Sequence, residues 1–139
     1  MSGTERYDFA VTQNVALLFE KSAILGYNSE EFVRCLLTSE IGEQLFTFGS
    51  PYQWLGYNYV MEHMENEFKE DITKPGEVYG SESMYWTGWI YFYWHRITGE
   101  SPKEIYEQAK CWDIAKLYVG YHTQSERVVI DELKRMYNS

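Results

Sequence analysis

The sequence predicts an all-α fold in a single domain over residues 1–139. Apolar residues recur along most of the chain at the three- and four-residue spacing of a helix face. Serine or asparagine precedes glutamate or glutamine by three residues at several places, which is the pattern of a helix capping box. The chain has 139 residues, of which 45% are apolar, and this length and composition are typical of a domain with one hydrophobic core. We therefore expect a bundle of about seven helices around a central aromatic-rich helix at about residues 82–98.

Three helices are expected in the first part of the chain. The first covers about residues 11–25, where apolar side chains share one face, and Gly26 can end it in a left-handed conformation. Asn28, with Glu31 three residues later, has the pattern of a cap for the second helix. A short third helix is expected at about residues 39–49.

A fourth, longer helix is expected from Ser50 to about Lys69. Ser50 is followed by a proline at the first helical position and by Gln53 at the position that completes a capping box. Residues 71–80 contain a Pro-Gly pair and form the longest interruption of the helical pattern. We interpret them as a loop within one domain, because neither half of the chain could bury a core alone.

The central helix is expected between Ser81 and Gly99. Its apolar residues lie on every side of the helix, which is typical of a helix surrounded by other helices. The segment is too long for an ordinary strand, although its many aromatic residues also favour strands. Its tryptophan and tyrosine side chains carry polar atoms that need hydrogen-bond partners when they are buried.

Three further helices are expected after Gly99. The segment Ser101–Glu104 repeats the serine–proline capping box, and a short helix follows it. Another helix is expected at residues 112–119 and ends at Gly120. The segment Thr123–Glu126 is a third capping box, which begins the last helix.

The chain is acidic, with a net charge of −9. This charge opposes binding of a nucleic-acid backbone by general electrostatic attraction, so no nucleic-acid partner is expected on this basis. The acids concentrate in residues 1–80, where thirteen acids stand against five bases. The densest group is expected either to be a solvated helix face or to form an acidic rim that attracts a basic partner. It consists of Glu62, Glu65, Glu67, Glu70 and Asp71.

Several classes of function have no pattern in this sequence. It has no nucleophile elbow, no phosphate-binding glycine loop and no Glu-x-x-His pair, so no catalytic residue, metal site or cofactor is expected. Cys35 and Cys111 lack the spacing of a zinc or redox site and are interpreted as buried apolar residues. No run of eighteen apolar residues and no apolar leader occurs, so we expect no membrane association and a cytoplasmic location.

The candidate partner- or ligand-binding residues lie on one edge of the aromatic helix and in the turn after residue 120. Tyr91 and His95 are one helical turn apart, and Arg96 follows directly. Tyr121 and His122 follow a glycine that is expected to end a helix at the same end of the molecule. Tyrosine and arginine are typical of interface hot spots, although a role in the core is the alternative for each ring.

The segments Tyr85–Trp94, Glu100–Tyr106 and Tyr121–Thr123 together resemble a group of small uncharacterised bacterial proteins. The genes of that group lie beside toxin–antitoxin modules, including modules whose toxin resembles an ADP-ribosyltransferase. The resemblance covers about residues 81–131 and includes no catalytic motif. Phe92 stands where an arginine would be expected between two tyrosines, so no charged contact is implied there. The resemblance implies an accessory or antitoxin-like role.

Three hypotheses about function follow from these observations. The first is a non-enzymatic binding protein, antitoxin- or immunity-like, whose partner is a protein with a basic or polar surface. The second is a small ligand-binding domain or enzyme with an aromatic pocket around His95, Arg96 and His122. The third is an acidic inhibitor that mimics nucleic acid through its carboxylates.

Overall fold

The structure is a computed structural model that describes residues 2–139. Helices make up 72% of the described residues, which contain no strand, so the all-α prediction is confirmed. These residues form ten helices rather than about seven. The helices are α1 (Gly3–Ile24), α2 (Ser29–Leu37), α3 (Glu40–Leu45), α4 (Pro51–Trp54), α5 (Tyr57–Phe68), α6 (Ser81–Thr98), α7 (Pro102–Gln108), α8 (Cys111–Ala115), α9 (Tyr118–Tyr121) and α10 (Glu126–Tyr137). Over residues 2–139, no helix combines the length and the apolar character that crossing a membrane requires.

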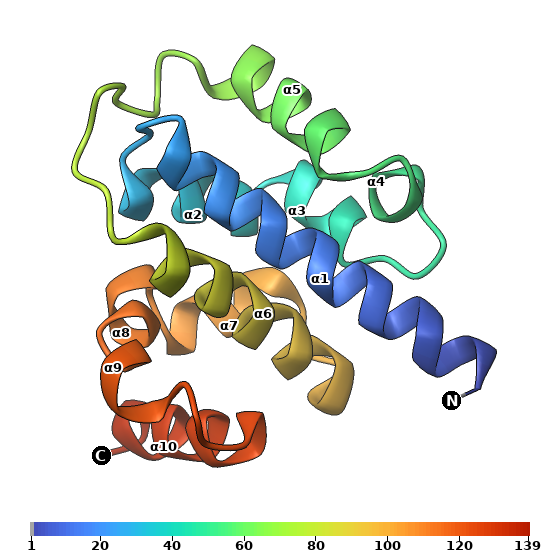
Figure 1. Cartoon of the computed structure of the whole chain (residues 1–139), viewed down its shortest axis with the longest axis vertical. Coiled ribbons are helices and arrows are strands. Elements are labelled where there is room, and N and C mark those ends of the chain that lie inside the picture. Colours follow the sequence, from blue (N-terminus) through green and yellow to red (C-terminus); the bar gives the residue numbers. More distant parts are fainter. Residues whose placement is uncertain (1) are drawn as a thin grey trace.

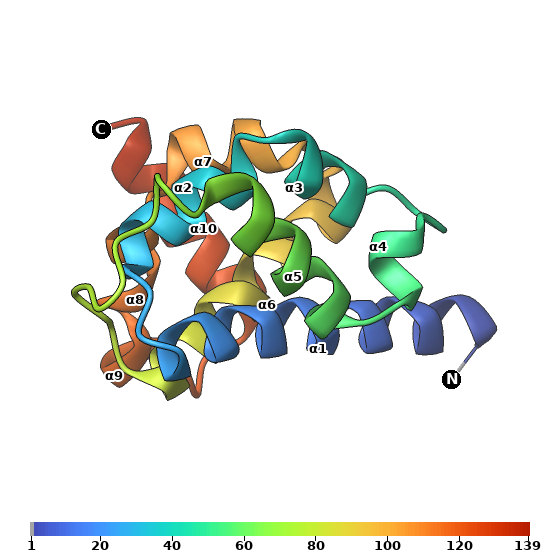
Figure 2. The same ribbon diagram turned by 90° about the horizontal axis from the view of Figure 1, so that it is seen from above.

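The two longest helices, α1 and α6, lie side by side and form the most extensive helix pair (Figure 1). Helices α4 and α5 cover α1 on the edge away from α6, whereas α9 and α10 cover α6 on the opposite edge. Helices α2, α3 and α7 lie behind this central pair, as the view from above shows (Figure 2). One hydrophobic core therefore includes residues from both halves of the chain.

Helix α6 lies at the centre of the fold, as predicted, but it is not buried on every side. Trp94, Tyr91 and Ile90 are completely buried in the core. Gly88 permits the close approach to α1, because a methyl group at this position would lie 2.8 Å from the Phe19 ring. The outward side of α6 is only partly covered, and its half-buried aromatic residues form the site described below.

Two of the predicted caps are present in the structure. The Asn28 side chain accepts a hydrogen bond from the backbone amide of Glu31 at 2.9 Å. The Ser101 hydroxyl accepts one from the amide of Glu104 at 3.1 Å, and the Glu104 carboxylate accepts one in return from the amide of Ser101 at 3.0 Å. The second cap is thus a reciprocal capping box, which pairs two amides that α7 would otherwise leave unpaired.

Replacing Ser101 tests this capping box. We expect Ser101→Ala to lower the free energy of unfolding by about 1 kcal/mol, because the amide of Glu104 loses its acceptor. Denaturant unfolding measures the loss. The control is Ser81→Ala, which changes an exposed serine at the first residue of α6, where Gly80 holds the cap position. Equal stabilities of the two variants would show that the box contributes nothing.

The capping box predicted at Ser50 is wrong. The Ser50 hydroxyl points back to the preceding segment and donates a hydrogen bond to the carbonyl of Gln44. The Gln53 side chain donates to the carbonyl of Leu45 at 2.9 Å and accepts from the Tyr7 hydroxyl. Both side chains therefore join α4 to α3 and α1, because buried polar groups take the partners that the tertiary fold offers.

The long helix predicted from Ser50 to Lys69 is broken in two. Gly56 adopts a φ of 100°, a conformation that favours glycine, and separates α4 from α5. The first amide of α5, that of Tyr57, donates a hydrogen bond to the side chain of Asn14 at 2.9 Å. Helix α5 is thus capped from α1 rather than by a neighbour in the sequence, and local spacing could not reveal this.

The C-terminal region also differs from prediction in two details. The helix expected at 112–119 is divided into α8 and α9 by a turn in which the amide of Leu117 bonds to the carbonyl of Ile114 at 2.9 Å. The last helix is capped by Ser125, which accepts from the amide of Val128 at 3.3 Å, so its capping residue is not Thr123. Eight helical segments are expected one by one from the sequence, and these two splits, at Gly56 and before α9, raise that number to the ten helices of residues 2–139.

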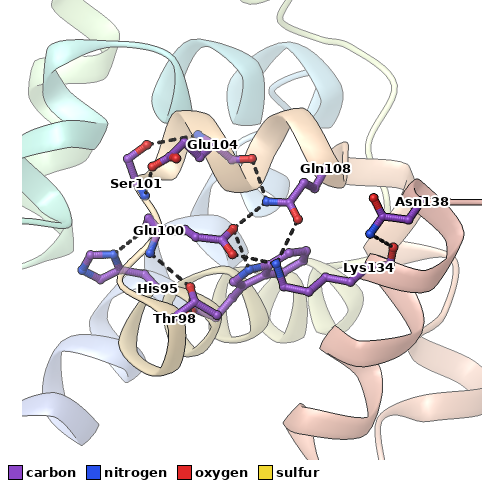
Figure 3. A network of polar contacts seen from close by, with 9 residues as sticks. His95, Thr98, Glu100, Ser101, Glu104, Gln108, Lys134 and Asn138 are labelled. Carbon is purple, nitrogen blue, oxygen red and sulfur yellow. Dashed lines mark hydrogen bonds and ion pairs between the residues drawn. The ribbon is translucent and has the colours of Figure 1, made fainter.

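A polar network fastens α10 to the rest of the fold (Figure 3). The ammonium group of Lys134 lies 2.6 Å from one carboxylate oxygen of Glu100 and 3.0 Å from the side-chain oxygen of Gln108. The other Glu100 oxygen accepts from the Trp94 indole at 3.3 Å and from the Gln108 amide at 2.5 Å. Glu100 therefore joins α6, α7 and α10.

This network makes stability depend on pH. Burial alone would raise the pKa of Glu100, but hydrogen bonds from Lys134 and Gln108 outweigh it and lower the pKa below its usual value of 4.5. A lowered pKa in the folded state stabilises the fold above pH 4.5, and this contribution is lost as the pH falls through the folded pKa. We expect the melting temperature to fall between about pH 6 and pH 3, and to fall less steeply in Glu100→Gln. Parallel slopes would contradict this role.

Candidate functional site

The predicted site residues do not form one group in the structure. Tyr91 is fully buried, and its hydroxyl donates a hydrogen bond to the carbonyl of Ala109 at 2.7 Å. Its ring lies 5.8 Å from that of Phe19, and burial raises the pKa of its hydroxyl well above the usual value. The prediction that Tyr91 is an exposed contact residue is therefore wrong, because it lies on the side of α6 that faces α1.

His95 and Arg96 lie at the C-terminal end of α6, beside a cleft of about 250 Å³ that Tyr7 and Asp8 also line. The Arg96 guanidinium donates to the hydroxyl of Thr12 at 3.2 Å and lies 3.9 Å from the Asp8 carboxylate. The Nδ1 of His95 donates to the carbonyl of Glu100 at 2.7 Å. The polar groups of this cleft are thus engaged in contacts within the chain.

His122 lies near the other end of α6. It borders two adjoining clefts together with Tyr85 and Trp86. Trp86 and His95 are separated by about 14 Å along the axis of α6, from the rise of a helix per residue. The prediction of one pocket around His95, Arg96 and His122 is therefore wrong. Tyr121 packs partly against the core and does not line either cleft.

The two clefts beside His122 form the aromatic groove, which is the candidate functional site. Each cleft has a volume of about 300 Å³, and they adjoin because they share three lining side chains. The groove lies between the outward side of α6 and the segment from α9 to the start of α10, and α1 contributes one residue. Its lining consists of Tyr85, Trp86, Trp89, Tyr118, His122, Gln124 and the carboxylates of Glu20, Glu82 and Glu126.

The aromatic rings of the groove contact one another in fixed orientations. The ring of Tyr118 is stacked on that of His122, with a centroid distance of 4.4 Å and an interplanar angle of 18°. The rings of Trp86 and Tyr118 meet edge to face, with a centroid distance of 5.9 Å. Tyr85 and Trp89 lie nearly parallel at 6.4 Å. The groove therefore presents rigid ring surfaces, which lose little conformational freedom when they are covered.

Two of the three carboxylates are held in place by aromatic donors. The indole nitrogen of Trp89 donates to Glu126 at 3.0 Å, and the hydroxyl of Tyr118 donates to Glu82 at 3.3 Å. Partial desolvation, followed by the charge of Glu82, raises the pKa of Tyr118, so this hydroxyl keeps its proton at neutral pH. Among residues 2–139, no lysine or arginine lines either cleft. The groove therefore combines negative charge with aromatic surface.

His122 adds an acceptor to the groove when its ring is neutral. Its Nδ1 lies 2.6 Å from the carbonyl oxygen of Tyr118. A carbonyl can only accept, so Nδ1 carries the proton and Nε2 keeps a lone pair in the neutral ring. This contact within α9 and its cap also fixes the orientation of the ring against Tyr118.

The predicted acidic rim does not surround the candidate site. Its residues lie on α5 and in the loop that follows, and Figure 1 shows α5 on the opposite side of the central helices from α9 and α10. Glu65 accepts a hydrogen bond from the Tyr27 hydroxyl, and burial together with Glu65 raises the pKa of Tyr27 to about 12. The other four carboxylates, those of Glu62, Glu67, Glu70 and Asp71, are exposed.

Sequence reasoning missed most residues of the groove. Tyr85, Trp86 and Trp89 lie on one side of α6, but a helix with apolar residues all round does not indicate which side faces outward. The four-residue spacing of Tyr118 and His122 was a usable signal for a stacked pair. The carboxylates of the groove come from three separate helices, so only the tertiary fold brings them together.

Neither a cluster of metal-ligating side chains nor an exposed thiol occurs among residues 2–139. Over residues 2–139, no three His, Cys, Asp or Glu side chains are close enough to hold a metal ion. Cys35 and Cys111 are buried and unpaired, and burial raises the pKa of both thiols.

Comparison of this chain with protein-family models, with curated protein sequences and with solved structures finds no match.

Proposed function

We propose that the chain is a non-enzymatic binding protein that covers a surface of a protein partner, in the manner of an antitoxin or immunity protein. The observation that carries the proposal is the open aromatic groove, which has three carboxylates and no lining cation among residues 2–139. Rigid tyrosine and tryptophan rings are typical of interface centres, because they bury large areas at small entropic cost. The two buried thiols suit a cytoplasmic location.

The mechanism of such a protein is occlusion. The groove supplies the centre of the contact, and Phe9 extends its aromatic surface, because its exposed ring lies 5.4 Å from that of Trp89. The net charge of −9 attracts a partner with a basic surface and increases the rate of encounter. The exposed carboxylates on α5 lie on a different face of the molecule and make no direct contact with the partner.

Affinity capture from cells of the native host tests the proposal. We expect the immobilised chain to retain a protein that mass spectrometry identifies, and we expect a variant with Glu82→Gln and His122→Ala to lose it. Both side chains are exposed, so the variant is expected to fold. The matched control carries Glu62→Gln, which makes the same change of charge on α5. Retention of the same protein by all three forms would contradict the proposal.

The rate of association with that partner is expected to fall steeply as salt is added. Exposed charges are screened beyond about 8–10 Å at physiological ionic strength. Stopped-flow measurements at about 0.05 M and 0.5 M salt provide the comparison, and the dissociation rate is expected to change much less. An association rate that does not respond to ionic strength would remove electrostatic attraction from the mechanism.

A further inference from the structure

We infer that the aromatic groove binds an arginine side chain of the protein partner. The inference rests on the proposed function and specifies what occupies the groove. Its first support is charge complementarity. Glu20 and Glu82 line one cleft and Glu126 lines the adjoining one, whereas neither cleft has a lysine or arginine among its described lining residues. A cation at the junction of the clefts therefore faces carboxylates from both sides.

The second support is a pattern that recurs elsewhere in the molecule. At three places a cation of this chain lies over an aromatic ring, and a carboxylate either pairs with that cation or accepts a hydrogen bond from the aromatic residue. The groove has the same combination of ring and carboxylate, but the described chain supplies no cation to it. The three internal sets are Arg96 with Tyr93 and Asp8, Lys134 with Trp94 and Glu100, and Lys74 with Tyr27 and Glu65.

The third support is the arrangement of hydrogen-bond acceptors. Glu126 and Glu82 each use the Oε2 atom to accept from an aromatic donor, and neither Oε1 atom has a hydrogen bond to the described residues. The donors Trp89 and Tyr118 thus hold each carboxylate in position and leave one oxygen available. The Nε2 of a neutral His122 is a further acceptor at the junction of the clefts.

These features favour arginine over lysine. A guanidinium is planar and can stack on a ring, and its five N–H donors point in several directions within one plane. It can therefore contact the shared rings of Tyr85 and Trp86 and donate to carboxylates in both clefts. An ammonium group is compact and more strongly hydrated. Because it is too small to reach both clefts at once, it can pair with the acceptors of only one cleft.

Nuclear magnetic resonance tests the inference with a defined probe, the capped tripeptide acetyl-Gly-Arg-Gly-amide. Titration into the labelled protein is expected to shift the indole N–H signals of Trp86 and Trp89 and to leave that of the distant, exposed Trp54 unchanged. The same peptide with lysine is expected to bind at least fivefold more weakly, and the peptide with citrulline, which is neutral and nearly the same shape, at least tenfold more weakly.

Variants of the protein complete the test. Glu82→Gln together with Glu126→Gln is expected to weaken binding of the arginine peptide at least tenfold, whereas the matched pair Glu62→Gln and Glu67→Gln leaves it unchanged.

Three results would each overturn the inference: equal binding of the arginine and citrulline peptides, equal binding of the arginine and lysine peptides, or no shift of either indole signal. If the partner depends on the groove but the arginine peptide does not bind, the proposed function stands and the inference fails. If the peptide binds but capture of the partner does not depend on the groove, the proposed function fails.

Discussion

Trp94→Ala is expected to lower the free energy of unfolding by about 3–5 kcal/mol, because a fully buried aromatic side chain is removed from the core. Part of this loss of stability comes from the cavity that the indole leaves between α6 and its neighbours. A further part is polar, because the indole donates to Glu100 and Lys134 lies 5.2 Å from the centre of the ring. A loss of this size is a large share of the stability of a domain, which is about 5–15 kcal/mol.

Trp54→Ala is the matched control for this prediction. Trp54 is 63% exposed at the end of α4, so its removal is expected to change stability by about 0.5 kcal/mol or less. Denaturant unfolding followed by circular dichroism compares the two variants. If Trp94→Ala does not fold, Trp94→Phe, which keeps most of the ring volume, provides an intermediate loss. A Trp94 variant as stable as the Trp54 variant would contradict the central position of α6.

Gly42→Ala is expected to be the most damaging substitution of a small residue. A methyl group at Gly42 would lie 2.0 Å from the carbonyl oxygen of Leu36 and 3.2 Å from the Cα atom of Leu37. Both are backbone atoms at the end of α2, so no side-chain rotation relieves the overlap and α3 must move away. Overpacking typically lowers the free energy of unfolding by about 1–3 kcal/mol, and we expect Gly42→Ala to lower it by about 3 kcal/mol or more.

Gly120→Ala is the control for this substitution. Gly120 lies in α9, and a methyl group there meets no atom within 4 Å. Alanine has the higher helix propensity, so Gly120→Ala is expected to leave stability unchanged or to raise it by up to about 1 kcal/mol. Thermal unfolding of both variants distinguishes the effects. Similar melting temperatures would mean that α2 and α3 do not pack as closely as the structure shows.

The parts of the fold that the sequence predicted correctly depend on residues close together in the chain. The caps at Asn28 and Ser101 are of this kind, since donor and acceptor are three residues apart. The errors arose where a distant residue supplied the partner. Asn14 caps α5 from 43 residues away, and the hydroxyl of Ser50 turns back to Gln44. Local patterns contain no information about such contacts.

The candidate site was predictable only in part, for a related reason. The sequence predicts that one edge of the aromatic helix and His122 belong to a binding site, and the structure places His122 beside α6. Tyr91 was assigned to the wrong side, because a helix that is apolar all round can be rotated without changing its pattern. Its true orientation is set by Phe19 and Ala109, which contact Tyr91 from other elements.

The polar network at Glu100 has a consequence for how the molecule opens. Helix α10 lies at the end of the chain, and its attachment to α6 and α7 includes the contacts of Lys134 with Glu100 and Gln108. The same helix begins with Glu126, which accepts from Trp89 in the groove. Because cooperative units often open as whole elements, release of α10 would remove Glu126 from the groove while leaving α1 paired with α6. Hydrogen exchange of the amides in α10 would then report the lifetime of a binding-competent groove.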